Sequence, residues 1–381
     1  MRLLTKFLMP ERAAGTDPAL LPCKIRRQHR TKETTGELEG RPLFSFCVPR
    51  KPQHFLTQGK YAMAKEKRAK KTRELPGWTQ GAKILDVKKK APKIRVLSDL
   101  VYAQRIGDRS AQQLRLTVLI PETPEPKPAV LFFPGGGWLQ AAKDRFAENR
   151  WALAQAGFVV ASAEYRTIPA GFPAQLADGR AAVRFLRAHA SELSIDPDRI
   201  GIMGNSAGGW LALMVALAPK KSDCDTAEWA GFSSQVQAAC ALHPVTSLLG
   251  IAEGLGDESA AAHASAASPE ALLLNGMTFS GTPSPIDADP ARALAASPAG
   301  LLKRFRKGAL KIPFLLMAGS ADRVVSPRQS ASLFEVLKAK GADAKYFLLK
   351  GVDHSGDPAW YQKAVCEKVN GFFEKALGKK G

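Results

Sequence analysis

Residues 200–217 read Ile-Gly-Ile-Met-Gly-Asn-Ser-Ala-Gly-Gly-Trp-Leu-Ala-Leu-Met-Val-Ala-Leu, and this stretch decides the fold. A short apolar run ends in a Gly-x-Ser-x-Gly pentapeptide, and an apolar helix pattern follows at once. This order is typical of a sharp strand-to-helix turn with Ser206 at its tip, although an ordinary strand-to-helix turn is the alternative. A side chain at Gly204 or Gly208 would collide with the neighbouring strand or helix, so we expect glycine at both positions. The helix start also favours a developing negative charge beside Ser206.

From about residue 94 onward, short apolar runs alternate with longer amphipathic segments. Strands are expected at 114–120, 129–133, 158–163, 199–203, 236–242, 312–318 and 346–349. Helices are expected at 145–156, 173–190, 207–218, 328–340 and 358–376. This alternation predicts an α/β domain with a mostly parallel sheet and helices on both faces. We place the domain at 94–381, with an insertion rich in Ala, Ser, Gly and Pro at about 245–300.

A second glycine-rich turn, at residues 134–138, reads Pro-Gly-Gly-Gly-Trp and follows an earlier apolar run. Glycine lets the backbone approach closely and point its N–H groups into a site. Acyl transfer needs two such donors aimed at the tetrahedral oxyanion. We expect them from Gly136 or Gly137 together with Ala207, and a flexible loop is the alternative.

Two residues beside these turns are candidate substrate contacts. Trp138 follows the three glycines, where an aromatic ring can form the wall of a pocket. Core packing is an equally good interpretation of the same ring. Asn205 directly precedes Ser206, within the turn itself.

A serine nucleophile needs a base to accept its proton, and the base needs an orienting acid. His354 lies in a loop of small and polar residues after the last expected strand, a usual place for a base on such a sheet. A surface histidine in a loop is the alternative. Asp322 follows the preceding strand and gives the order Ser, acid, His. His243 is a rival base that comes too early in this order, and Asp353 is a rival acid that adjoins His354. The other histidines lie in the N-terminal arm, at a helix end or in the insertion: His29, His54, His189 and His263.

The net charge of +20 is concentrated at the N-terminus, where residues 1–95 hold 24 Lys and Arg against 8 Asp and Glu. We expect residues 1–93 to form a basic extension that is poorly ordered at least to residue 80. Such an arm could also bind nucleic acid or an anionic membrane surface, although no nucleic acid is expected as a partner. A third interpretation is that the true start is Met63, which opens Met-Ala-Lys-Glu-Lys.

The apolar runs are too short to span a bilayer, and no signal peptide is visible. The default expectation is therefore a cytoplasmic protein, with secretion left open if the start is misassigned. The five cysteines are odd in number and scattered, so they predict neither a metal site nor a disulfide framework. They are Cys23, Cys47, Cys224, Cys240 and Cys366, of which Cys240 is expected to be a buried thiol.

Residues from about 95 to 377 resemble the α/β-hydrolase esterases. Within them, the chain is most similar to bacterial carbohydrate esterases, the group with acetylxylan esterases and feruloyl-esterase-like enzymes. The spacing is also typical, with 116 residues from Ser206 to Asp322 and 32 from Asp322 to His354. The segments that carry the resemblance are Phe132-Phe133-Pro134-Gly135-Gly136-Gly137-Trp138, Glu164-Tyr165-Arg166, Ile195-Asp196-Pro197-Asp198-Arg199-Ile200, Gly204-Asn205-Ser206-Ala207-Gly208-Gly209, Ala296-Ser297-Pro298 and Gly319-Ser320-Ala321-Asp322-Arg323-Val324-Val325.

The resemblance implies the α/β-hydrolase fold, a triad of Ser206, Asp322 and His354, and an oxyanion hole at the glycine turn. It implies hydrolysis of a carboxylic ester through an acyl-enzyme, with no metal and no cofactor. The substrate it points to is a short-chain acyl ester of a carbohydrate or small molecule. Hormone-sensitive-lipase-like esterases usually carry His before the three glycines, where this chain has Pro134, and this difference favours the carbohydrate-esterase branch.

Three alternatives stay open at this point. A prolyl-oligopeptidase-like peptidase shares the fold and triad, although such enzymes usually carry a propeller for which this chain offers no segment of that size. A non-catalytic binding module on a hydrolase scaffold would have no need of all three triad residues. Tethering to nucleic acid through the basic arm is the third. The oligomeric state does not follow from the sequence.

Overall fold

A computed structural model of the chain describes residues 79, 83, 85, 87, 91–106, 111–221, 223–277 and 283–378. The chain divides into two units, Met1–Ile84 and Leu85–Gly381, and all the helices and strands described below belong to the second unit. The basic extension, with the candidate start at Met63, falls almost entirely outside the described residues. Its expected disorder and its partners therefore stay predictions.

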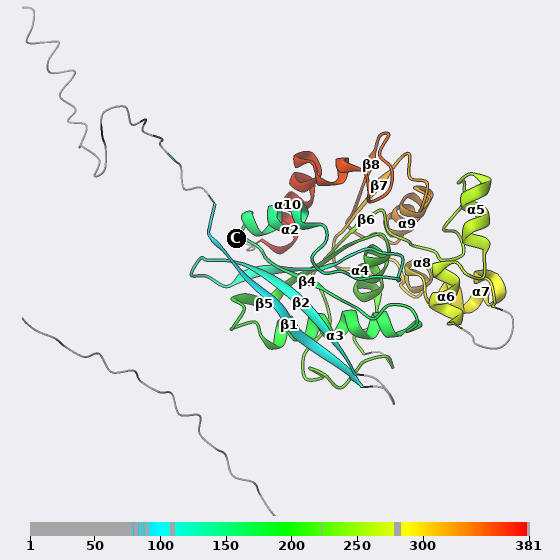
Figure 1. Ribbon diagram of the computed structural model, residues 1–381, viewed down its shortest axis with the longest axis horizontal. Coiled ribbons are helices and arrows are strands. Elements are labelled where there is room, and N and C mark those ends of the chain that lie inside the picture. The colour runs from blue at the N-terminus through cyan, green and yellow to red at the C-terminus, as the bar shows by residue number, and fades with distance from the viewer. Residues whose placement is uncertain are drawn as a thin grey trace, which may run out of the picture. The chain divides into compact units, whose positions relative to one another are not determined.

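The centre of the second unit is an eight-stranded sheet in the order β1-β2-β4-β3-β5-β6-β7-β8 (Figure 1). The strands from β4 onward along this order are all parallel. Strands β3, β4, β6 and β7 are almost wholly buried because helices cover both of their faces. The strands are β1 (Ile94–Ile106), β2 (Ala111–Pro121), β3 (Lys127–Phe133), β4 (Val159–Ala163), β5 (Ile195–Asn205), β6 (Ala238–Leu242), β7 (Phe314–Gly319) and β8 (Ala344–Leu349).

Strands β1 and β2 pair antiparallel at one edge of the sheet, and β2 also runs antiparallel to β4. Strand β1 does not appear among the strands expected from the sequence. Most of its residues are at least partly exposed, so it presents no continuous apolar run. It is held by its long backbone pairing with β2, which the local sequence does not reveal.

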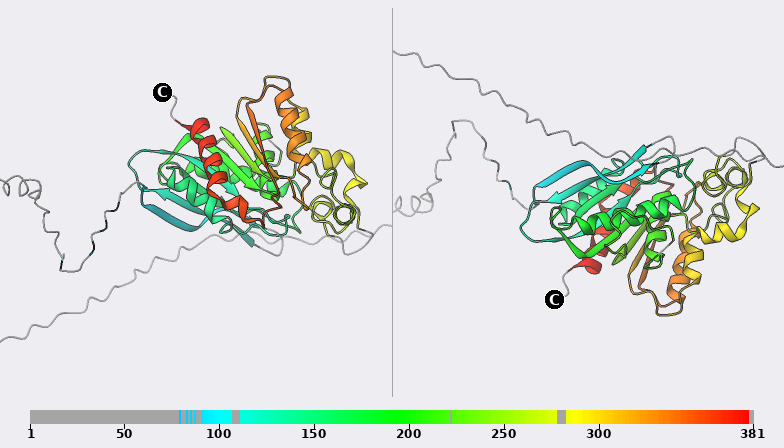
Figure 2. Two further views of the ribbon diagram at one scale, coloured as in Figure 1. Left: turned by 90° about the horizontal axis from the view of Figure 1, so that it is seen from above. Right: turned by 90° about the horizontal axis from the view of Figure 1, so that it is seen from below.

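Two helical layers cover the two faces of the sheet. Helices α2 and α10 pack on one face, with Phe158 and Phe373 in edge contact there. Helices α3, α4 and α9 contribute to the core on the other face. Figure 2 shows α10 in front of the sheet in one view and behind it in the other. The helices are α2 (Ala147–Gln155), α3 (Ala174–Ala188), α4 (Ala207–Leu217), α9 (Arg328–Ala339) and α10 (Lys363–Leu377).

Short helices occupy the segment between β6 and β7, where the sequence predicts an insertion. They lie together on the right of Figure 1. Each of α6, α7 and α8 has proline in its first turn, a position that needs no backbone donor. The elements are α5 (Asp257–Ala264), α6 (Pro269–Asn275), η1 (Ile286–Ala288), α7 (Pro290–Ala295) and α8 (Pro298–Lys303).

The single helix expected at 358–376 is two elements, η2 (Pro358–Tyr361) and α10. Gln362 separates them because its backbone is extended, with ψ of 151°. The short turn is held by the loop before it: the Trp360 indole donates to the Asp353 carbonyl, and the Tyr361 hydroxyl donates to the Ser355 carbonyl. These contacts tie η2 to the loop that carries His354, and sequence periodicity does not reveal them.

The other expected strands and helices are confirmed within a few residues, and so is the mostly parallel sheet with helices on both faces. Cys240 is fully buried in β6, as expected, and burial raises the pKa of its thiol. Among the described residues, no helix is long and apolar enough to cross a membrane.

Candidate active site

Ser206 lies at the junction of β5 and α4, on a backbone with φ of 52° and ψ of −124°. Residues other than glycine rarely adopt a positive φ, so this turn holds local strain. A Cβ atom at Gly204 would lie 2.1 Å from the Gly208 carbonyl oxygen, and one at Gly208 would lie 2.1 Å from the Phe133 carbonyl oxygen. The expectation that only glycine fits at both positions is confirmed.

Three side chains that each follow a strand of the sheet form one line of hydrogen bonds. His354 Nε2 lies 2.9 Å from Ser206 Oγ, and His354 Nδ1 lies 2.7 Å from Asp322 Oδ2. Ser206 follows β5, Asp322 follows β7 and His354 follows β8. With a carboxylate beside Nδ1, the imidazole carries its proton there and leaves Nε2 free to accept the serine proton. The structure thus brings the three predicted residues together.

The second oxygen of Asp322 is held by the backbone of its own loop. Oδ1 accepts the N–H groups of Val324 and Val325, each at 2.9 Å. Its side chain is 1% exposed, so water does not compete for the carboxylate. This arrangement fixes the orientation of Oδ2 toward His354 and keeps a buried charge hydrogen-bonded.

The rival acid, Asp353, points away from the imidazole. Its carboxylate accepts from Nε and Nη2 of Arg323, at 2.9 and 2.6 Å, and from the backbone N–H of His354. Partial burial raises the pKa of Asp353, but the hydrogen bonds from Arg323 and from the backbone outweigh this and lower it. Asp353 therefore braces the loop around His354 and does not contact its ring.

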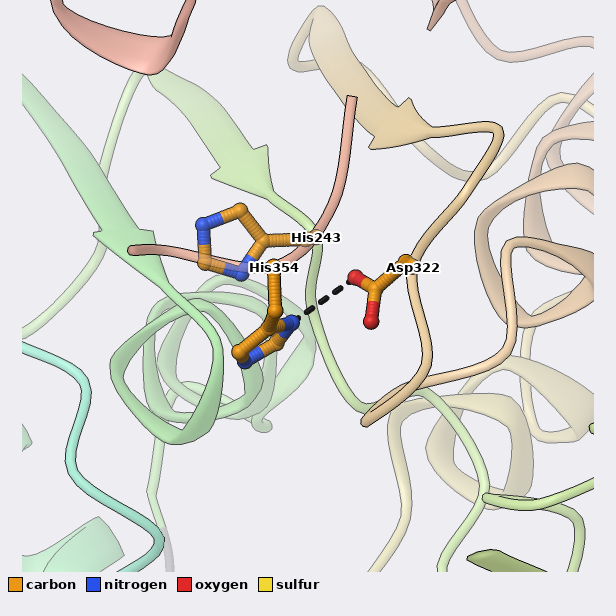
Figure 3. A group of neighbouring side chains, drawn as sticks. All are labelled: His243, Asp322 and His354. Carbon is orange, nitrogen blue, oxygen red and sulfur yellow. Dashed lines mark hydrogen bonds and ion pairs between the residues drawn. The ribbon is translucent and has the colours of Figure 1, made fainter. Parts of the chain in front are cut away.

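The rival base, His243, lies against the ring of His354, with the centroids 4.4 Å apart. Figure 3 shows both rings with Asp322, and only His354 is hydrogen-bonded to the carboxylate. His243 is 3% exposed, and its Nδ1 has no hydrogen-bond partner among the described residues. Burial, and then the charge of His354, lower the pKa of His243 well below its usual 6.5. Burial therefore favours the neutral form of His243.

Donor atoms of His243, Asp322 and His354 all lie within 4.8 Å of one another, a set that also suits a metal ion. The distance of 2.7 Å between His354 Nδ1 and Asp322 Oδ2 is typical of a charge-assisted hydrogen bond. A tetrahedral ion with bonds of about 2 Å would hold the same two atoms roughly 3.3 Å apart. The geometry therefore fits a hydrogen-bonded pair better than a metal centre.

The glycine turn, residues 134–138, follows β3, and its first two residues are each held by a hydrogen bond. The Pro134 carbonyl accepts the Tyr165 hydroxyl at 2.8 Å, and the Gly135 N–H donates to Asn205 Oδ1 at 2.9 Å. A Cβ atom at Gly135 would lie 3.0 Å from Cβ of Ser206, so the turn passes directly beside the serine.

The next two residues of this turn, together with Ala207, are the predicted oxyanion donors. Within the described part of the chain, no hydrogen bond uses the backbone N–H of Gly136, Gly137 or Ala207. These N–H groups lie on the two backbone segments that flank Ser206. Their role in an oxyanion hole stays a prediction.

The two predicted substrate contacts are both buried. Trp138 is 2% exposed and packs edge-on against Trp210, with ring centroids 5.5 Å apart. Its indole Nε1 has no partner among the described residues. Asn205 is 2% exposed and its side chain supports Gly135. The structure therefore gives Trp138 a packing contact and Asn205 a supporting contact, and substrate contact stays a prediction for both.

Beside His354 there is an open surface pocket of about 630 Å³. Its walls come from α5, from the loop after β7 and from the loop after β8. Most of the lining side chains are polar or charged: Glu258, Ser259, Ala262, Arg323, Val324, Asp353, His354, Gly356, Asp357 and Pro358. A further pocket, of about 520 Å³, contains Lys311, Asp343 and Phe372 and includes no triad residue.

Sequence reasoning missed two groups that support the site. Tyr165, which follows β4, anchors the glycine turn, and His263 on α5 contacts the loop of Asp322. Their partners lie 31 and 61 residues away in the chain, so no local pattern marks them. The Ala296-Ser297-Pro298 segment is structural, since the Trp210 indole donates to the Ala296 carbonyl at 2.8 Å.

The fold and the geometry of this site define the chain as an α/β-hydrolase. It belongs to the BD-FAE family, whose profile matches residues 116–337. Among solved structures, a truncated carbohydrate esterase from gut microbiota is 23% identical, with a TM-score of 0.63 over 77% of this chain and 99% of the other. The predicted fold and the predicted family resemblance are confirmed.

Two further comparisons concern named esterases. Thermogutta terrifontis esterase 2 phosphonylated by sarin is 25% identical, with a TM-score of 0.57 over 76% of this chain and 97% of the other. A probable isoprenylcysteine alpha-carbonyl methylesterase of Arabidopsis thaliana is 27% identical over 261 residues, which are 63% of this chain and 48% of the relative. The chain thus spans about half the length of that curated relative.

Proposed function

We propose that this chain is a serine hydrolase of carboxylic esters, with Ser206 as nucleophile, His354 as base and Asp322 as orienting acid. The observation that carries the proposal is the unbroken line of hydrogen bonds through these three side chains, at 2.9 and 2.7 Å. The strained backbone of Ser206 adds to it, because such strain commonly marks a functional position.

The reaction begins when Ser206 Oγ attacks the ester carbonyl carbon and His354 Nε2 takes its proton. Asp322 stabilises the imidazolium that forms and keeps its ring in place. The alcohol leaves when the C–O bond of the ester breaks and His354 returns the proton to the alcohol oxygen. Water, deprotonated by His354, then attacks the acyl-enzyme, which releases the carboxylic acid and restores Ser206.

The negative charge that develops on the carbonyl oxygen is held by backbone donors. We assign these donors to Gly136 or Gly137 and to Ala207, whose N–H groups are otherwise unused in the described structure. The start of α4 contributes its helix dipole at the same place. Fixed donors of this kind need no rearrangement as the charge forms, which is why they lower the barrier.

The comparisons support an ester over a peptide as the substrate. The Arabidopsis relative is named a methylesterase and the Thermogutta neighbour an esterase. The Thermogutta neighbour is phosphonylated by sarin, and phosphonylation is a reaction of an electrophile with a nucleophilic side chain. These names describe those proteins, and they favour ester hydrolysis by this chain over the peptidase and binding-module alternatives.

Within ester hydrolysis, we assign a short acyl group and a polar, hydroxyl-bearing alcohol, such as a carbohydrate. The pocket beside His354 lies where the base meets the leaving alcohol, and its charged walls suit hydroxyl groups better than an alkyl chain. On the other side, Pro269 of α6 lies 3.9 Å from where a Gly137 side chain would begin, so α6 comes within van der Waals contact of the glycine turn.

We also propose the domain limits expected from the sequence: a catalytic domain at 94–381, a basic extension before it, and an insertion at about 245–300. The insertion contributes α5 to the pocket beside His354, and its helix α6 lies next to the glycine turn. Substrate selection would therefore depend on this segment more than on the sheet.

A substrate screen tests the proposal. Wild type and Ser206→Ala would be assayed on p-nitrophenyl acetate, butyrate and octanoate, on acetylated xylan and on methyl ferulate. We expect turnover that is fastest for acetyl esters and absent in the variant. A folded wild-type protein that cleaves none of these esters would overturn the proposal, and a preference for octanoate would overturn the assigned acyl group.

A further inference from the structure

His263 of α5 bridges the insertion and the loop that carries Asp322. Its Nδ1 lies 2.6 Å from Glu270 Oε1 on α6, and its Nε2 lies 2.8 Å from the Val324 carbonyl oxygen. The ring is thus held at both nitrogens, by two elements that are separated in the chain. Neither contact involves a triad side chain.

Both acceptors are of a kind that favours the doubly protonated ring. A carbonyl oxygen can only accept, so Nε2 carries a proton, and the carboxylate of Glu270 is best satisfied by a proton on Nδ1 as well. The Glu270 side chain is 1% exposed, and the ring of His263 gives this buried carboxylate a hydrogen-bond partner. The hydrogen bond from Glu270, only partly opposed by burial, raises the pKa of His263 above its usual 6.5.

No other charged side chain among the described residues is hydrogen-bonded to the ring of His263. Arg323, on the contacted loop, is paired with Asp353. Asp257 and Glu258 lie in the first turn of the same helix, and Asp322 is bound to His354. Glu270 is therefore the charged group that sets the protonation of His263.

The peptide unit that His263 contacts is one that orients the triad acid. The Val324 carbonyl oxygen accepts from His263, and the N–H of the same peptide unit, that of Val325, donates to Asp322 Oδ1 at 2.9 Å. The preceding carbonyl, of Arg323, accepts the Ser259 hydroxyl of α5 at 3.0 Å. Helix α5 therefore donates hydrogen bonds to two successive carbonyls of this loop. The backbone N–H groups of the same loop donate to Asp322.

We propose that His263 is a positioning residue: clamped by Glu270, it fixes the Val324 peptide and through it the Asp322 carboxylate against His354. The proposal rests on the proposed hydrolase function, since its effect on turnover runs through the triad. It also makes the insertion a part of the catalytic support as well as a wall of the substrate pocket. A shift of about 1 Å in a catalytic group can cost on the order of 100-fold in rate.

The test compares His263→Gln with two matched controls. Gln keeps a donor for one acceptor and removes the charge, and we expect kcat to fall roughly 10- to 100-fold with a smaller change in KM. His189→Gln removes a partly buried histidine that pairs with Glu192 at a distant helix end, and it should leave kcat unchanged. Ser259→Ala loosens the same loop without removing a titrating group, so it should lower kcat less than His263→Gln does.

The pH profile separates positioning from a general loss of stability. Because the pKa of His263 is raised in the folded protein, the clamp is complete at low pH and is lost as the pH rises through that raised pKa. Wild-type kcat should therefore decline at alkaline pH. This decline should move to lower pH in Glu270→Gln, keep its position in Ser259→Ala and disappear in His263→Gln.

Hydrogen exchange of residues 322–326 gives a readout that does not depend on turnover. We expect faster exchange of the Val324 and Val325 amides in His263→Gln than in wild type. If His263→Gln shows the same kcat, the same pH profile and the same exchange rates as wild type, the proposal is overturned. Failure of wild type to hydrolyse esters would instead remove the proposed function, and the exchange result would still decide whether His263 fixes the loop.

Discussion

Asp322 Oδ2 and His354 Nδ1 lie 2.7 Å apart, although the two residues are separated by 32 positions and follow different strands. The neighbouring Asp353 is one residue from His354 in the chain, yet its carboxylate binds Arg323. Spatial order along the sheet, and not closeness in sequence, therefore decides which acid orients the base.

This pairing makes Asp322→Asn and Asp353→Asn a matched test. We expect Asp322→Asn to lower kcat by on the order of 10⁴, because an amide favours the wrong tautomer of His354. Asp353→Asn removes an exposed ion pair with Arg323, which is worth about 1 kcal/mol or less, and should keep most of the activity. Equal losses in the two variants, measured by steady-state kinetics, would contradict the assignment of the acid.

The glycine before the serine turn gives a prediction on stability. Gly204→Ala should destabilise the protein by at least about 3 kcal/mol, since the new Cβ would lie 2.1 Å from a backbone oxygen that cannot move aside. Gly371 in α10 is the control, because no atom lies within 4 Å of a Cβ added there. Gly371→Ala should stabilise the helix by about 0.5–1 kcal/mol. Urea unfolding measures both, and similar effects of the two variants would refute the steric account.

Asn205 is expected to act on catalysis through the glycine turn. Asn205→Ala removes the acceptor of the Gly135 N–H, so we expect kcat to fall roughly tenfold with little change in KM. Asn370→Ala is the control, since that side chain donates to the Ala152 carbonyl within the α2–α10 layer, away from the site. If kcat falls equally in both variants, the loss reflects stability and not the position of the oxyanion donors.

We expect the burial of His243 to make the stability of the protein depend on pH. Its pKa is held well below 6.5 in the folded protein, chiefly by burial, so the unfolded chain binds a proton more readily. The contribution of His243 to the free energy of unfolding is complete above about pH 6.5. It is lost as the pH falls, by up to about 1.4 kcal/mol per pH unit. His243→Phe should remove this part of the slope while the ring still packs on Trp360. An unchanged dependence of unfolding free energy on pH between 5 and 7 would show that His243 titrates normally.

The sequence was most informative where a local pattern and a strict steric demand coincide. The Gly-x-Ser-x-Gly turn, the buried parallel strands and the order of Ser206, Asp322 and His354 can all be predicted from it. Each depends on residues within one strand-turn-helix unit or on a chain order that the fold imposes. The structure adds the distances that join them.

The sequence was least informative where a residue acts through distant partners. Strand β1 is half exposed and depends on pairing with β2, so it has no apolar run to reveal it. The side chain of Asn205 holds Gly135, 70 residues earlier, a role that its place beside Ser206 does not reveal. His263 meets Glu270 and Val324 only after the insertion has folded over the loop.

The central claim is that Ser206 is the nucleophile, and covalent labelling tests it most directly. The folded protein would be treated with a fluorophosphonate, and the adduct would be located by mass spectrometry of its peptides. We predict one adduct per chain, on Ser206, formed rapidly in wild type, slowly in Asp322→Asn and not at all in Ser206→Ala. No adduct on the folded wild-type protein, or an adduct on a different serine that persists in Ser206→Ala, would contradict the account.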